Sequence, residues 1–142
     1  MTENYKKARE LLNGSCATCV LCKDEQVITS ELSGIAPMLG FIGDGTDLRG
    51  FSAADRIVGR AASMLFALAG VSEVYGEVMS REALPVLEKY CIEYGYGELT
   101  DYIVNRAGDG MCPMEKAVAG INSPADGYAA LEKRLSELQA GI

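Results

Sequence analysis

The segment SAADRIVGRAASMLFALA, residues 52–69, is the stretch from which we predict the fold. Ser52 and Asp55 have the S-x-x-D spacing of a helix capping box. After Arg60 the segment is apolar almost all round, which is typical of a helix buried on every side. The pattern therefore predicts a central helix over residues 53–69.

The segments before and after this helix show helix and strand patterns in turn. In chain order, we predict a helix over 3–12, a β-hairpin over 16–22 and 26–29, a helical turn within 35–42, strands over 71–79 and 99–104, and helices over 80–90, 113–119 and 124–139. A hairpin followed by strands that alternate with helices predicts a three-layer α/β/α fold with a mixed sheet. With 142 residues we expect one domain, with a core over 5–122 and a closing helix over 124–139.

Composition excludes several classes of function. The formal net charge is −7 and the 13 Lys and Arg residues are scattered, so the chain lacks the basic surface that nucleic acids or anionic membranes require. Residues 1–13 lack the apolar region of a secretory signal, and the longest apolar stretch, 61–71, is too short to span a bilayer. We therefore expect a cytoplasmic protein with reduced cysteines.

The chain contains no histidine. This excludes Ser-His-Asp and Cys-His catalysis, histidine-ligated zinc and a histidine general base. Proton transfer would need Asp, Glu, Lys, Tyr, Cys or water. We predict no metal and no cofactor.

The triplet Cys16, Cys19 and Cys22 has a spacing that can hold an iron–sulfur cluster, and Cys112 before Pro113 could supply a fourth thiolate. In a strand, however, side chains alternate between the two faces. Cys16 and Cys22 would then face one side and Cys19 the other, so three thiolates could not converge. The strand pattern of this segment favours buried structural cysteines.

Cys112 is the best candidate for a reactive thiol. Pro113 suits the first position of a helix, so Cys112 would be its N-cap and Glu115 its third residue. The positive end of the helix dipole and the nearby Arg106 would favour a thiolate, whereas Glu115 would oppose it. The alternative is that Cys112 only caps the helix and fixes the loop.

Other polar residues are candidates for the same pocket. Asp55 could transfer protons, or it could serve only in the capping box. Ser33, Gly34, Asn105 and Arg106 could line a cleft. Helix N-termini attract anions, and we expect such termini at Ser52, at Ser80 and at the helix that follows Cys112.

Three stretches together resemble a known bacterial family. They are the hairpin with residues 33–37 (SGIAP), residues 54–62 (ADRIVGRAA), and Asn105-Arg106 with residues 112–115 (CPME). The family is the domain of unknown function 1893, a metal-less branch of the cytidine deaminase-like superfamily. The resemblance covers about residues 5–122. It implies a cytidine deaminase-like fold and supplies no reaction.

The resemblance also implies the absence of catalytic zinc. In deaminases, a His or Cys followed by Ala-Glu starts one helix, and Pro-Cys-x-x-Cys starts the next. Here the predicted starts read 53–55 (AAD) and 80–83 (SREA), which contain no zinc ligand of these types. Members of the superfamily often self-associate, so we expect a homo-oligomer.

Three functional hypotheses remain open. In the first, the protein binds a small anionic metabolite, such as a nucleotide, in a pocket without zinc. In the second, it is a metal-independent enzyme with Cys112 as nucleophile, and Asp55 or Glu115 moves protons. In the third, it is an iron–sulfur or redox protein that uses the N-terminal cysteines.

Overall fold

The structure is a computed structural model and describes residues 1–105 and 107–141. The elements in chain order are α1 (Glu3–Asn13), β1 (Cys19–Lys23), β2 (Gln26–Ser30), α2 (Ala36–Gly43), β3 (Ser52–Val58), α3 (Arg60–Ala69), β4 (Glu73–Ser80), α4 (Ala83–Lys89), β5 (Glu93–Thr100), α5 (Pro113–Val118) and α6 (Pro124–Gln139). Across the described ranges, no helix combines the length and the apolar character needed to traverse a bilayer.

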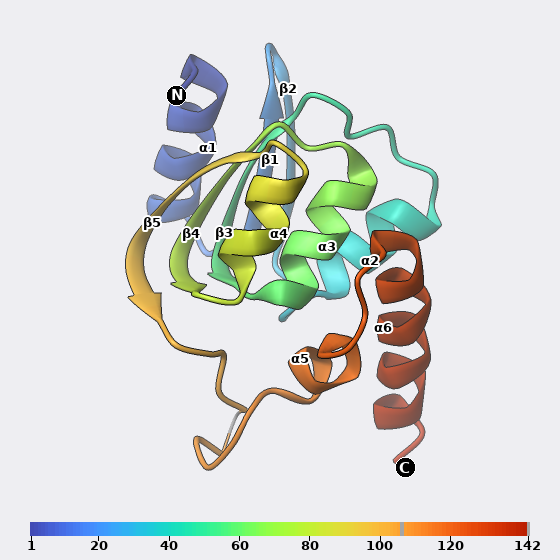
Figure 1. The fold of residues 1–142 in the computed structure, drawn as a ribbon. Helices are drawn as coiled ribbons and strands as arrows, with labels where there is room; N and C mark the ends of the chain where they lie inside the picture. The colour runs from blue at the N-terminus through green and yellow to red at the C-terminus, as the bar shows by residue number, and fades with distance from the viewer. Residues whose placement is uncertain (106, 142) are drawn as a thin grey trace.

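The five strands form one mixed sheet in the order β2-β1-β3-β4-β5. Strands β3, β4 and β5 are parallel, and β1 is antiparallel to both of its neighbours. Helix α1 covers one face of this sheet, and α3 and α4 cover the other (Figure 1). Helices α2 and α6 pack on α3, and α5 packs on both α3 and α6. The predicted three-layer α/β/α architecture is confirmed.

The prediction for residues 53–69 was wrong in its first half. Residues 52–58 form β3, the central strand, and the helix begins only at Arg60, after Gly59. Ser52 and Asp55 therefore do not form a capping box. Ser52 Oγ instead donates a hydrogen bond to Glu73 Oε1 at 2.6 Å. Arg60, predicted in mid-helix, opens α3.

Small side chains explain why this segment can serve as the central strand. Ala53 and Ala54 are fully buried on opposite faces of β3, under α3 and α1 respectively. Their size lets both helical layers approach the sheet closely. The strand also forms hydrogen bonds with β1 on one edge and β4 on the other, and this pairing outweighs the helix propensity of alanine.

Two further boundaries differ from the predictions. Ser80 ends β4 and is not a helix N-cap, because α4 begins three residues later. The last strand covers Glu93–Thr100 instead of residues 99–104. Gly95 and Gly97 weaken the strand pattern in the sequence, but they are needed in the structure: a Cβ at Gly97 would lie 2.8 Å from the carbonyl oxygen of Glu77.

The other predicted elements are confirmed within a few residues: α1, the hairpin of β1 and β2, α2, β4, α5 and α6. In β1, Cys19 packs in the hydrophobic cluster on the α3 side and Cys22 in the cluster on the α1 side. Cys16 is exposed and precedes the strand. The alternation predicted for Cys19 and Cys22 is therefore confirmed, and these thiols do not converge.

Candidate functional site

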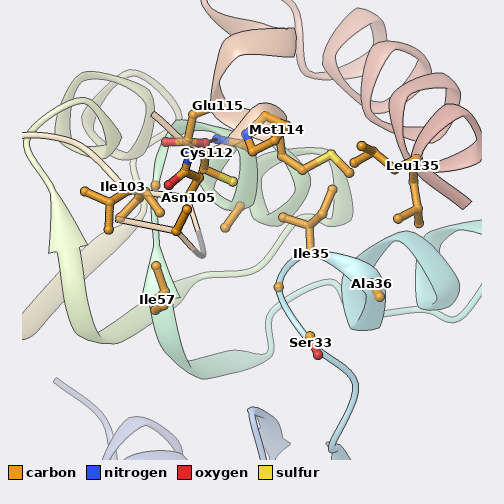
Figure 2. Close-up of a pocket in the computed structure, with 18 of the residues that line it drawn as sticks. Ser33, Ile35, Ala36, Ile57, Ile103, Asn105, Cys112, Met114, Glu115 and Leu135 are labelled. Carbon is orange, nitrogen blue, oxygen red and sulfur yellow. Dashed lines mark hydrogen bonds between the residues drawn. The ribbon is translucent and has the colours of Figure 1, made fainter. Parts of the chain in front are cut away.

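A cavity of about 910 Å³ lies at the carboxyl end of β3. Its walls come from the loop before α2, the end of β3, the first turn of α3, the loop after β5, the start of α5 and the end of α6. Figure 2 shows Ile103 and Asn105 on one side of the space and Ile35 and Leu135 on the other. Ligand sites in parallel sheets occur at this edge, and this volume is in their usual range.

Most side chains that line the cavity are apolar. These are Ile35, Ala36, Ile57, Ala61, Ala62, Ile103, Val104, Ala107, Pro113, Met114, Leu135 and Leu138. The polar ones are Ser33, Asn105, Cys112, Glu115 and Gln139. A mainly apolar lining with a few polar groups is typical of sites for small organic molecules.

Glu115 fixes α5 as one wall of the cavity. Its carboxylate accepts hydrogen bonds from the backbone N–H groups of Arg60 at 2.8 Å and Ala61 at 2.7 Å, and so caps the N-terminus of α3. Burial raises the pKa of Glu115, and these two N–H groups oppose the rise. A Cβ at Gly59 would overlap the carboxylate and would lie 2.8 Å from Ile103 Cγ1, so glycine leaves room for this contact.

Arg60 forms the reciprocal contact. Its Nε donates to the carbonyl oxygen of Val118 at 3.2 Å, and Nη2 donates to the carbonyl oxygen of Ile121. The guanidinium thus binds carbonyl groups at and just beyond the end of α5. Together, Glu115 and Arg60 connect α5 to α3 in both directions.

A short antiparallel pairing positions Cys112 at the start of α5. Val104 and Met111 form an isolated bridge, Asn105 N donates to Gly110 O at 2.8 Å, and Cys112 N donates to Ile103 O at 2.9 Å. Cys112 is the N-cap of α5, as predicted, but its side chain makes no capping hydrogen bond. Its thiol is half-buried on the cavity wall.

The structure brings together five of the predicted site residues. Ser33, Gly34, Asn105, Cys112 and Glu115 all line the cavity. The Asn105 side chain also closes its own loop, because Nδ2 donates to Asp109 Oδ1 at 2.9 Å. Arg106, predicted to bind a ligand, lies outside the described residues.

The other three predicted site residues lie elsewhere. Asp55 is buried in β3, paired with Cys19 of β1 and Gly76 of β4, and does not line the cavity. Ser52 is the first residue of β3, at the end of the strand away from the cavity. Ser80 is fully buried at the end of β4, and its Oγ has no hydrogen-bond partner in the described part of the chain. Neither serine begins a helix, so the helix N-termini predicted at these two residues are absent.

Several cavity residues were not predicted. Ile57, Leu135 and Leu138 have patterns that favour core positions, although Ile57 is 51% and Leu138 40% exposed. Gly59 carried a usable signal, because glycine often interrupts a helix or strand pattern or marks a close backbone approach. The contact between Glu115 and the start of α3 joins residues 55 positions apart and has no local signal.

We expect the purified protein to contain no stoichiometric zinc. The chain has no histidine, α3 starts at Gly59-Arg60, and α4 starts after Ser80-Arg81-Glu82, so neither start carries a thiol or imidazole. Elemental analysis of protein purified without chelators, with the final dialysis buffer as blank, tests this. One tightly held zinc per chain would contradict the prediction and would point to the cysteines.

The comparisons with known proteins address the family and the fold. The profile of the family described as TM1506, domain of unknown function (DUF1893), matches residues 7–135. A crystal structure of a DUF1893 family protein from Thermotoga maritima aligns with 96% of this chain and 92% of its own, at 22% identity and a TM-score of 0.83. A search of curated proteins gave no match.

A second solved structure shows a partial likeness. It is a diaminohydroxyphosphoribosylaminopyrimidine deaminase/5-amino-6-(5-phosphoribosylamino)uracil reductase from Thermotoga maritima, 17% identical, with 65% of this chain and 34% of that chain aligned at a TM-score of 0.44. The family profile covers most of this chain, and the Thermotoga DUF1893 structure shares its fold along almost the whole length. The chain therefore belongs to the DUF1893 family.

Proposed function

We propose that this protein binds a small organic molecule with an apolar body in the cavity at the carboxyl end of β3. The observation that supports this most directly is the lining: apolar side chains from six separate segments line a space of about 910 Å³, with few polar groups among them. Ile57 and Val104 on this wall are 51% and 52% exposed, and a bound apolar molecule would cover them.

The helix N-termini give little support to the predicted binding of an anion. The predicted sites relied on helix N-termini at Ser52, Ser80 and Pro113. The two serines lie in strands, and a helix as short as α5 provides only a weak dipole. The N-terminus of α3 is already capped by the carboxylate of Glu115. Support for ligand binding therefore comes from the apolar lining, and nucleotides remain among the compounds to test.

A binding role fits the polar residues better than catalysis does. Cys112 lines the cavity, but both oxygens of Glu115 accept backbone hydrogen bonds, and Asp55 lies inside the sheet. Both oxygens of Glu115 are thus engaged by backbone N–H groups and Asp55 does not line the cavity, which disfavours either carboxylate as a general base. The enzyme hypothesis would need a proton acceptor brought by the substrate or by water.

The test uses Ile57→Trp and the uncharged fluorescent probe N-phenyl-naphthylamine. Ile57 lines the cavity but is half-exposed, so an indole can fill the space without disturbing the core. We expect the probe to bind the wild-type protein and its affinity to fall about tenfold or more in the variant, a loss of about 1.4 kcal/mol. Val27→Trp is the control, because Val27 is 42% exposed on the edge strand β2, away from the cavity.

Cysteine alkylation mapped by mass spectrometry supplies a second readout. The bound probe should slow modification of Cys112 and leave the exposed Cys16 and Cys91 unchanged. Equal probe affinity in Ile57→Trp and the wild type, with no protection of Cys112, would show that the probe binds elsewhere and would contradict the proposal.

A further inference from the structure

A small groove with two basic side chains lies beside the cavity. It has a volume of about 290 Å³ and is lined by Pro113, Lys116, Ala117 and Arg134. These residues belong to α5 and α6, which pack against each other. Pro113 lines both the groove and the cavity, and Arg134 immediately precedes Leu135, which lines the cavity. The groove thus adjoins the cavity at the start of α5.

The groove carries positive side chains, unlike the lining of the cavity beside it. The protein has a formal net charge of −7, and no Lys or Arg is among the described residues that line the cavity. The groove has two. Lys116 is exposed, and its ammonium forms no ion pair with another described residue. Arg134 Nη1 lies 3.6 Å from Glu137 Oε1, which leaves the rest of its guanidinium for another partner.

We infer that the ligand is an amphiphilic anion, with an apolar body in the cavity and one carboxylate, sulfonate or phosphate group in the groove between Lys116 and Arg134. This inference rests on the proposed function and specifies the class of ligand. The anionic group would reach the groove by passing over Pro113. The guanidinium of Arg134 offers a planar donor pair, and Lys116 adds a point charge.

The two parts of the site depend on each other. An exposed Lys116 and a half-buried Arg134 bind a free anion weakly in water, because each charge pair is still partly solvated and screened. An apolar body held in the cavity keeps the attached anion next to both cations at a high effective concentration. The groove therefore selects among molecules that the cavity already binds, and it is not an independent anion site.

The experiment compares two probes that differ by one charge: anilinonaphthalene sulfonate and its uncharged parent, N-phenyl-naphthylamine. In the wild-type protein at low salt, we expect the sulfonate to bind about 3- to 10-fold more tightly than the parent, the scale of two partly screened charge contacts. High salt should remove this difference. The combined Lys116→Gln and Arg134→Gln variant should also remove it, without changing the affinity of the uncharged probe.

Two single variants test whether the effect is specific to the groove. Lys133→Gln removes a positive charge from the residue next to Arg134, but Lys133 lines neither the groove nor the cavity, so both affinities should stay as in the wild type. Glu137→Gln removes the carboxylate that competes for Arg134, so the sulfonate should bind more tightly.

The possible outcomes separate this inference from the proposed function. If the uncharged probe binds in the cavity but the sulfonate binds no more tightly, the ligand class is wrong and the binding proposal stands. If Lys133→Gln weakens the sulfonate as much as the combined variant does, the effect is general electrostatics and the groove is not the anion site. If neither probe binds the wild type, the proposed function and this inference both fail.

Discussion

The Asp55→Asn variant is expected to be more stable than the wild-type protein by up to about 4 kcal/mol at neutral pH. Burial raises the pKa of the Asp55 carboxyl from 3.8 to about 8, despite the opposing effects of the backbone N–H groups of Ile57 and Arg56 and of the Arg56 charge. Each pKa unit corresponds to about 1.4 kcal/mol, and neutral pH lies about three units above the ordinary value. Asparagine cannot ionise and retains a carbonyl acceptor.

The direction of the pH dependence follows from proton binding. Between about pH 4 and pH 8, the folded chain keeps a proton on Asp55 that the unfolded chain has lost. The free energy of unfolding of the wild type should therefore fall as pH rises through this window, and this contribution should be level outside it. The variant should lack this decline. Its gain in the free energy of unfolding over the wild type should therefore be absent near pH 4 and largest above pH 8.

Urea unfolding measured across this pH range, with Asp101→Asn as control, tests the prediction. The Asp101 side chain is 84% exposed beside Arg81, so its loss should change stability by less than about 1 kcal/mol. A lower stability of Asp55→Asn than of the wild type at neutral pH would contradict the prediction. A buried acid that lowers stability is also typical of functional sites, so this residue deserves an activity assay once a ligand is known.

The fold could be predicted where local pattern and tertiary environment agree. Helices α1 and α6 have amphipathic spacing, and the hairpin of β1 and β2 has a polar turn, so their positions were clear from the sequence. Residues 52–58 show the opposite case. Ala53 and Ala54 favour a helix when considered alone, and only pairing with both neighbouring strands makes them a strand. Such pairing involves distant residues, so local periodicity does not report it.

The candidate site also contains residues that could be predicted from local sequence pattern and residues that could not. Cys112 and Glu115 could be identified because the pattern Cys-Pro-x-Glu indicates a helix start locally. The apolar wall could not be identified from the sequence, since Ile57 and Leu135 show the spacing of ordinary core residues. Whether such a side chain packs against protein or faces a cavity depends on where α5 and α6 lie. The groove of Lys116 and Arg134 likewise depends on the packing of two helices.

The Glu115→Ala variant is expected to lower the free energy of unfolding by about 2–4 kcal/mol. The carboxylate accepts hydrogen bonds from the backbone N–H groups of Arg60 and Ala61, and each such bond to a charged group contributes about 1.5–3 kcal/mol. The cost of burying the carboxylate offsets part of this sum. Glu115→Gln keeps one acceptor but turns an amide NH₂ toward the other N–H, so we expect an intermediate loss.

Urea unfolding gives the global effect, and hydrogen exchange shows whether it is local to the contact between α3 and α5. The control is Glu132→Ala on α6, where an exposed carboxylate accepts a hydrogen bond, among the residues that the structure describes, only from the Tyr128 hydroxyl at 2.9 Å, so little stability should be lost. In Glu115→Ala, amide exchange should accelerate at Arg60, Ala61 and along α5 more than in α1, which packs on the opposite face of the sheet. Equal acceleration in α1 and α5 would mean that Glu115 contributes only to global stability and does not fix the cavity wall.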